Sequence, residues 1–162
     1  MSFSIRIANP ADAELITQLA DRIWRKHYMA IIGVEQVNYM LDKMYSVESL
    51  IHQMTTEGHR FYIGSKDDTP IAYASVSDNE GDMFLHKLYI DTELQTKGFG
   101  TKMVENMLQL YPHKKTLQLT VNRKNYKAIN FYFKLGFKID HVADFDIGEG
   151  FFMNDFVMIK QF

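Results

Sequence analysis

The sequence contains no cysteine among its 162 residues. A disulfide framework and a catalytic thiol are therefore excluded. Its six histidines show no paired spacing such as H-E-x-x-H, so we expect no metal site. No run approaches the roughly 18 apolar residues of a membrane span, and the first residues lack the basic and apolar regions of a signal peptide. We therefore expect no membrane partner and a cytoplasmic location.

The chain also lacks an excess of charge of either sign. Its 18 Lys and Arg residues against 20 Asp and Glu residues give a formal charge of −2, so no basic field favours nucleic acid as a partner. Hydrophobic residues make up 46% of the chain, which is enough for a core without metal or disulfide support. We expect a single domain over residues 1–162.

The hydrophobic patterns predict strands and helices in alternating groups. Strands are expected at 4–8, 60–64, 71–77, 84–90, 116–121, 137–142 and 151–159, with an acidic loop at 144–149. Helices are expected from 9 to 28, around 37–44, after 46, from the turn near 100 to about 111, and at 125–135. This order mixes hairpins with β-α-β steps. It predicts an α/β (α+β) fold with a mixed, mostly antiparallel sheet of about seven strands flanked by helices.

A glycine turn, Gln95-Thr96-Lys97-Gly98-Phe99-Gly100-Thr101, joins a strand to a helix. Glycines there allow close approach of the backbone, and the free amides of the first helical turn favour an anion. The turn therefore predicts a phosphate site. Met103 replaces the third glycine of a dinucleotide fingerprint, and no G-x-x-x-x-G-K-[ST] occurs, so both of those nucleotide folds are excluded. A simple strand-to-helix connection remains the alternative.

A second motif follows in the run from Asn122 to Phe137. The pattern Q-x-x-G-x-G, followed 20 to 25 residues later by N-x-x-A-I-x-F-Y-x-x-x-G-F, resembles the GNAT superfamily of acyl-CoA-dependent N-acetyltransferases. The resemblance extends over nearly the whole chain and is least informative at residues 25–57. It implies a single-domain GNAT-like fold and acetyl-CoA as co-substrate.

The resemblance also implies which residues bind coenzyme A. The amides from Gln95 to Thr101 would hold the pyrophosphate, with Lys97 adding charge, and the strand residues Leu88, Tyr89 and Ile90 would pair with the pantetheine arm. The Ile90 amide would polarise the thioester carbonyl. Asn122 and Asn125 would bond the pantetheine amides. Lys134 would reach the adenosine phosphate, although an exposed helical lysine is more often solvated.

Two residues are predicted to be catalytic. Tyr132 matches the GNAT tyrosine near the coenzyme sulfur, where its hydroxyl would act as general acid; packing beside Phe131 is the alternative. Relatives often carry a glutamate near the position of His86. By the strand period of two, His86 should share a face with Leu88 and Ile90. A histidine base suits neutral pH, but a hydrogen-bonded packing residue is an equal alternative.

Asp155 is the candidate substrate residue. It shares parity with Met153 and Val157 on the last strand and is expected on the covered face. A carboxylate there would anchor a cationic amine or act as base, or else make a structural hydrogen bond. The stretches 144–148, 154–158 and 88–90 also resemble bacterial polyamine acetyltransferases of the PaiA type.

The sequence thus predicts direct acetyl transfer from acetyl-CoA to a primary amine of a small molecule, with a polyamine as one candidate. An inactive acyl-CoA sensor or interaction module and a protein N-acetyltransferase are the alternatives. Phe151 and Phe152 would pair two protomers in a homodimer, or else complete the core.

Overall fold

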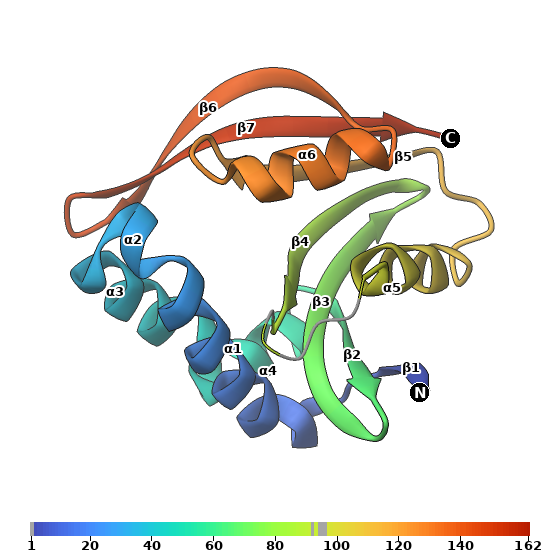
Figure 1. The fold of residues 1–162 in the computed structure, drawn as a ribbon, viewed down its shortest axis with the longest axis horizontal. Helices are drawn as coiled ribbons and strands as arrows, with labels where there is room; N and C mark the ends of the chain where they lie inside the picture. The colour runs from blue at the N-terminus through green and yellow to red at the C-terminus, as the bar shows by residue number, and fades with distance from the viewer. Residues whose placement is uncertain (1, 92, 94–96) are drawn as a thin grey trace.

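The computed structural model describes residues 2–91, 93 and 97–162. Within them, seven strands form one sheet in the order β1-β2-β3-β4-β5-β7-β6 (Figure 1). The strands are β1 (Phe3–Ile7), β2 (Arg60–Lys66), β3 (Thr69–Asn79), β4 (Asp82–Ile90), β5 (Thr116–Asn122), β6 (Lys138–Gly148) and β7 (Phe151–Gln161). The helices are the 3-10 turn η1 (Pro10–Asp12), α1 (Ala13–His27), α2 (Met29–Ile32), α3 (Val34–Tyr45), α4 (Val47–Thr55), α5 (Phe99–Leu108) and α6 (Tyr126–Lys134).

The predicted mixed, mostly antiparallel sheet is confirmed. Among the described strands, β4 and β5 pair in parallel and the other neighbours are antiparallel. The prediction of a loop at 144–149 is wrong, because β6 continues to Gly148. Its apolar residues Ile139, Val142 and Phe145 are three apart, and register shifts at Ile139/His141 and Asp146/Gly148 break the two-residue alternation. The sequence pattern therefore ended the strand too early.

The helices cover both faces of the sheet, with a separate core on each. Helices α5 and α6 pack on one face around Met103, Met107 and Leu117, while α1, α3 and α4 pack on the other around Ile23, Val37 and Leu50. Helix α1 buries the apolar stripe that the helical spacing predicted. Apolar side chains at both faces leave the central strands little contact with water.

The sheet opens between its two central strands. Strand β4 pairs with β5 over four positions, from Asp82 with Thr116 to Leu85 with Leu119. Beyond them β4 continues to Ile90 and β5 to Asn122 without pairing with each other. Figure 1 shows the two halves of the sheet diverging there, with α6 above the gap and α1 below it. The divergence leaves strand backbone available on both sides of an opening.

A β-bulge lies in β4 just past this point. Ser75 pairs with Lys87 but Val76 pairs with Leu85, so His86 is the extra residue. Leu85, Leu88 and the neighbouring Ile90 consequently pack against the same core. A bulge re-aims the side chains around it relative to the regular alternation.

Candidate active site

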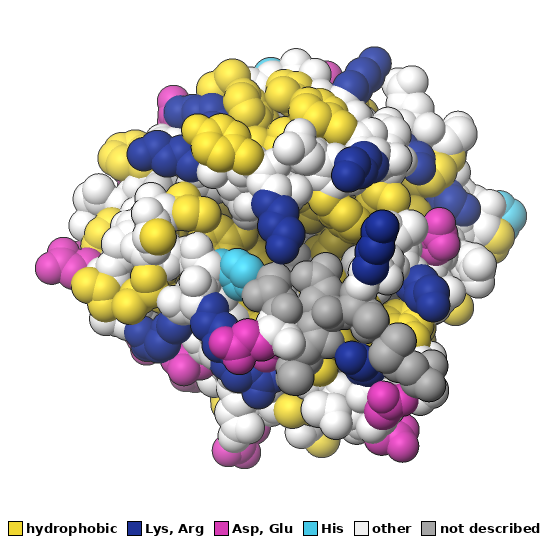
Figure 2. Space-filling model, viewed as in Figure 1, with side chains coloured by type: hydrophobic (Ala, Val, Ile, Leu, Met, Phe, Trp, Pro, Cys, Tyr) yellow, Lys and Arg dark blue, Asp and Glu magenta, His cyan; other side chains and the backbone are white. Residues whose placement is uncertain are grey.

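A cleft of about 290 Å³ occupies the opening between β4 and β5. Its walls are the diverging ends of β4 and β5, helices α1 to α3 and α6, and the middle of β7. Figure 2 shows hydrophobic side chains at the floor of the hollow in this face, with Lys and Arg side chains and one His at its rim. An apolar cleft with a few polar groups is typical of a small-molecule site.

The backbone of β4 is free on the side that faces the cleft. The Asp91 amide donates to the Ile71 carbonyl across 2.8 Å, so Asp91 and Ile71 form a hydrogen-bonded pair of the β3–β4 ladder. Because such pairs alternate in an antiparallel ladder, Leu88 and Ile90 direct their N–H and C=O groups away from β3. Those groups point toward β5, which no longer pairs there. The backbone N–H and C=O groups of Tyr89 instead point toward β3.

Two glycines lie at the N-terminus of α5. Gly98 caps α5 at φ +84° in the left-handed region, and a Cβ there would meet nothing within 4 Å. A Cβ at Gly100 would lie 3.1 Å from the Phe131 ring and 3.2 Å from Ile90 Cδ1, so the glycine permits close packing beside the cleft. The Phe99 side chain is buried in the core, whereas Lys97 is exposed. Thr101 is partly buried. The predicted contacts of Gln95 and Thr96 lie outside the described residues.

The two predicted asparagines both line the cleft. Asn125 caps α6 through its side-chain oxygen, which accepts from the Ala128 amide at 3.3 Å, and its Nδ2 donates to the Tyr28 hydroxyl at 3.0 Å. The Asn122 oxygen accepts from the Lys124 amide at 2.9 Å. Both side chains therefore have structural hydrogen bonds, and their contact with a ligand stays a prediction. Lys134 is exposed on the last turn of α6.

Tyr132 lies in the wall of the cleft, on α6, and is 8% exposed. Its ring packs against Phe131 and Phe137. Packing, which was the alternative to a catalytic role, is therefore part of what this ring does. Burial raises the pKa of its hydroxyl, and the nearby Tyr28 raises it further. Tyr132 therefore stays protonated at neutral pH, and its role as general acid stays a prediction.

The prediction that His86 shares a face with Leu88 and Ile90 is wrong, because the bulge interrupts the alternation. The His86 ring stacks on His59 with centroids 3.8 Å apart, and its Nε2 lies 2.8 Å from Ser77 Oγ. Burial lowers the pKa of His86 to about 3, and the charges of His59 and Lys87 add to this. His86 touches the cleft, but it is poorly suited to accept a proton at neutral pH.

Asp155 has the expected position on the covered face. It is 3% exposed, pairs with Asn122 of β5, and lines the cleft. Burial raises the pKa of its carboxyl group to about 6; a hydrogen bond with Thr120 and the charge of Arg123 oppose this rise, while Asp144 supports it. A carboxyl group with this pKa is ionised at neutral pH and can accept a proton.

Three cleft residues escaped the sequence analysis. Trp24 and Tyr28 come from α1 and its C-terminal cap, and their rings lie 4.6 Å apart, with Tyr89 close to both. Lys87 follows the bulge; its Nζ donates to Gln53 Oε1 at 2.7 Å, and burial lowers its pKa to about 8. An amphipathic helix pattern accounts for Trp24 and Tyr28 as core residues, so nothing in the pattern marked them as cleft residues. A lysine in an otherwise apolar strand was the available signal for Lys87.

The part of the chain that the structure describes contains neither a membrane-spanning helix nor a metal-binding cluster. None of its helices is long and apolar enough to cross a membrane. Nor do three or more His, Asp or Glu side chains of the described residues converge where they could hold a metal ion.

Phe151 and Phe152 differ in exposure. Phe151 packs on Tyr39 of α3 with ring centroids 5.1 Å apart, whereas Phe152 is 47% exposed. Pairing of protomers through Phe152 stays a prediction.

Comparison with known proteins connects this geometry to a family. The spermidine N(1)-acetyltransferase of Thermoplasma acidophilum is 25% identical over 168 residues, covering 100% of this chain and 99% of that protein. The peptidyl-lysine N-acetyltransferase YjaB of Salmonella typhimurium is 27% identical over 126 residues, covering 76% and 78%. Both relatives are named as N-acetyltransferases, but for acceptors of different kinds.

Solved structures share the fold. The PaiA N-acetyltransferase of Thermoplasma acidophilum in complex with coenzyme A has a TM-score of 0.80 at 25% identity over all of both chains. A GCN5-related N-acetyltransferase of Rhodopseudomonas palustris has a TM-score of 0.82 at 15% identity, over 100% of this chain and 97% of that one. The model of the acetyltransferase (GNAT) family matches residues 16–137. This match spans most of the sequence, and the chain belongs to the GNAT family of acetyltransferases.

Proposed function

We propose that this protein transfers the acetyl group of acetyl-CoA directly to a primary amine of a small molecule. The observation that carries the proposal is the opening between β4 and β5, where free strand backbone, Tyr132 and Asp155 face one cleft. The chain has no cysteine, so transfer through an acetyl-cysteine intermediate is excluded.

The residues present fit coenzyme A. The free backbone groups of Leu88 and Ile90 suit an amide-bearing pantetheine arm, which would add to β4 as a further strand. Gly100, in the first turn of α5, lines the cleft, and the helix dipole and the exposed Lys97 favour a pyrophosphate there. The neighbouring PaiA structure contains coenzyme A, which supports the same assignment here.

Each cleft group then has a chemical role. Acetyl-CoA, when bound, supplies a thioester whose carbon–sulfur bond breaks as the carbon–nitrogen bond forms. Asp155 binds the protonated amine and accepts one proton from it, which frees the nitrogen lone pair for attack. The Ile90 amide polarises the carbonyl oxygen. Tyr132 donates its proton to the departing sulfur and recovers one from the acetylated nitrogen.

The acceptor end favours an aliphatic amine, with polyamines as the first class to test. Met40, Met44, Met153 and Trp24 line the same cleft as Asp155 and give it apolar and aromatic surface. Methylene groups can contact such walls while a carboxylate and an aromatic face bind the ammonium group. The spermidine acetyltransferase relative, which spans the whole chain, supports this class.

The proposal is tested by thiol release from acetyl-CoA over a panel of amines, with Tyr132→Phe as the informative variant. We expect thiol release with a linear polyamine, and a loss of about 10²-fold or more in kcat for Tyr132→Phe, because the phenyl ring keeps the packing but cannot donate a proton. Wild-type protein that binds acetyl-CoA tightly but releases no thiol with any amine would instead support the acyl-CoA sensor that the sequence left open.

A further inference from the structure

Arg123 lies in the short loop between β5 and α6 and contacts both β6 and β7. Its backbone N–H donates to the Asn154 carbonyl of β7 at 3.0 Å, and its Nη1 donates to the Asp155 carbonyl at 3.3 Å. Its Nη2 lies 2.8 Å from Asp144 Oδ1 of β6. One residue therefore holds the backbone of β7 at Asp155 and binds a carboxylate on the next strand.

The register of the sheet fixes the position of this ion pair. Asn122, the last residue of β5, pairs with Asp155, and Ala143 of β6 pairs with Asp155 from the other side. Asp144 follows Ala143 directly, and Arg123 follows Asn122. The Arg123–Asp144 pair therefore crosses β7 next to the row of the sheet that contains Asp155.

The groups that act on the Asp155 carboxyl group come from separate elements. Thr120 of β5 is hydrogen-bonded with it, and Tyr28 at the C-terminal end of α1 interacts with its charge. Arg123 from the β5–α6 loop and Asp144 from β6 are charged neighbours of opposite sign. Asp155 is 3% exposed, so water screens its interactions with these charges only weakly.

The two charges near Asp155 oppose each other. A buried carboxylate is unfavourable in its ionised form unless nearby charges or hydrogen bonds compensate for the loss of water. The guanidinium group of Arg123 favours the ionised form, and the carboxylate of Asp144 disfavours it. If Asp155 were stabilised too strongly it would be a weak base, and if it were stabilised too little it would already carry a proton at neutral pH. Proton transfer from the amine therefore depends on the balance of the two charges.

We propose that Arg123 is a positioning residue for acetyl transfer, which holds Asp155 in the cleft wall and, together with Asp144, sets how readily its carboxylate accepts the proton of the amine. This inference rests on the proposed function, in which Asp155 is the proton acceptor. Among the described residues, Asp155 lines the cleft but Arg123 and Asp144 do not. The pair therefore acts through Asp155 and not by touching the substrate.

The two partners of the ion pair provide variants with opposite expected effects. Arg123→Met removes the positive charge and leaves Asp144 unopposed, so the midpoint of the fall in kcat/KM at low pH should move up by about one pH unit. Asp144→Asn leaves Arg123 unopposed and should move the midpoint down. This shift should be smaller, about half a pH unit, because the Asp144 side chain is 57% exposed and water screens its charge. Loss of a purely structural contact would not move the midpoint in opposite directions.

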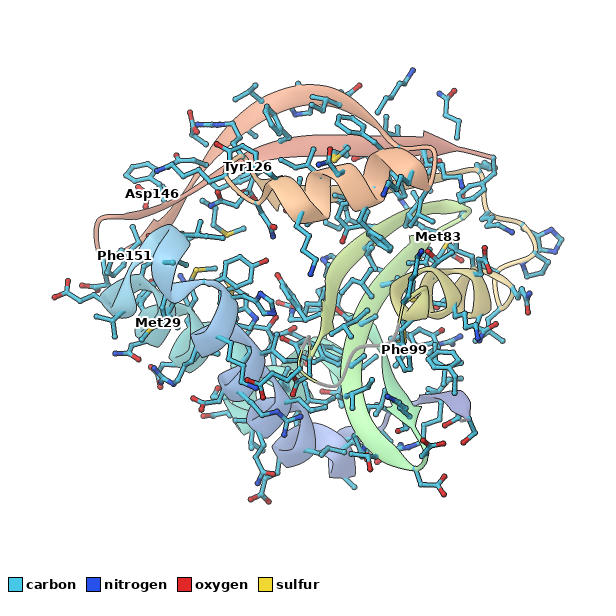
Figure 3. All side chains as sticks on the ribbon, viewed as in Figure 1. Met29, Met83, Phe99, Tyr126, Asp146 and Phe151 are labelled. Carbon is cyan, nitrogen blue, oxygen red and sulfur yellow. The ribbon has the colours of Figure 1, made fainter. Side chains whose placement is uncertain are left out.

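Asp146→Asn is the matched control on the same strand. Figure 3 shows Asp146 near the tip of the hairpin, farther along β6 than the start of α6 at Tyr126. Asp146 Oδ1 accepts from the Gly148 amide at 2.9 Å, and an asparagine oxygen keeps this bond. The control therefore removes one negative charge from β6 without touching the Arg123 ion pair, and its midpoint should equal that of the wild type.

The wild type and the three variants are assayed by thiol release from acetyl-CoA across the acid range. The acceptor is an amine that the wild type uses and whose pKa lies above 9, at limiting concentration. Opposite shifts in Arg123→Met and Asp144→Asn, with an unchanged Asp146→Asn, support the proposal. Added salt should reduce the Asp144→Asn shift, because that charge is partly exposed.

Different outcomes identify different failures. Midpoints that stay at the wild-type value in both variants, or that move in the same direction, overturn the proposal while the proposed function stands. A wild type that releases thiol but shows no fall in kcat/KM at low pH removes Asp155 as the base and overturns it as well. Absence of thiol release with every amine refutes the proposed function, and the role of Arg123 falls with it. If Arg123→Met does not fold, Asp144→Asn, which keeps the shape of the side chain, decides the question.

Discussion

Asp155 gives a sharp test of which residue accepts the proton. Its pKa of about 6 lies far above that of His86, about 3, so the two candidate bases predict different pH profiles. A carboxyl group with a pKa of 6 is about nine-tenths ionised at pH 7 and about one-tenth ionised at pH 5. If ionised Asp155 is required, kcat/KM for the amine falls about tenfold between these pH values. If His86 is the base, kcat/KM stays level over the same range.

The assay is thiol release at limiting amine concentration from pH 5 to pH 7.5. The acceptor is chosen with a pKa above 9, so that the concentration of its protonated form, which Asp155 is proposed to bind, stays constant over this range. Asp155→Asn preserves the shape of the side chain. It should lower kcat/KM about 10²- to 10⁴-fold and abolish the fall in kcat/KM at low pH, here called the acid limb. His86→Gln is the matched control and should keep the limb. A level wild-type profile, or a limb that survives in Asp155→Asn, would refute the reasoning.

Two further predictions concern packing around the cleft. Lys87 has a pKa lowered from 10.5 to about 8, so between these values the unfolded chain binds a proton that the folded chain does not, and stability rises with pH. The free energy of unfolding of the wild type, measured by urea titration relative to Lys87→Met, should therefore gain up to about 3 kcal/mol from pH 7.5 to pH 10.5; a constant difference would contradict burial of the ammonium group. Gly100→Ala places a Cβ 3.1 Å from the Phe131 ring. It should raise KM for acetyl-CoA about tenfold, which corresponds to about 1.4 kcal/mol, while changing kcat less, and an unaltered KM would show that α5 does not approach the coenzyme.

The sequence predicted the architecture well because its signals are local. Alternating strands, an amphipathic α1 and a glycine-capped α5 each depend on residues within one element, and apart from β6 they lie within a few residues of where they were expected. The position of Asp155 on the covered face also followed from strand parity. Predictions of this kind succeed when the period of one element decides which side chains are buried.

The predictions that failed depend on irregular backbone and on tertiary contacts. His86 does not lie on its expected face because one extra residue is inserted in β4, and no residue type in the strand predicts this bulge. The register shifts in β6 break the alternation of its side chains, so the predicted strand was shorter than the observed one. Tyr28 meets Asn125 only because α1 and α6 lie on either side of the opening. Such a contact joins residues 97 positions apart, which periodicity does not reveal.

Under the proposed function, the opening between β4 and β5 would also make the coenzyme a structural component. In the described ladder, β4 and β5 share only four residue pairs. A ligand that hydrogen-bonds to β4 and contacts β5 would therefore add interactions between the two halves of the sheet. Any ligand bound solely by the folded state adds RT ln(1 + [L]/Kd) to the free energy of unfolding, about 2.7 kcal/mol at one hundred times Kd. The resistance of this protein to unfolding and degradation would then follow the supply of acetyl-CoA, so that the abundance of the donor helps set the lifetime of the enzyme that consumes it.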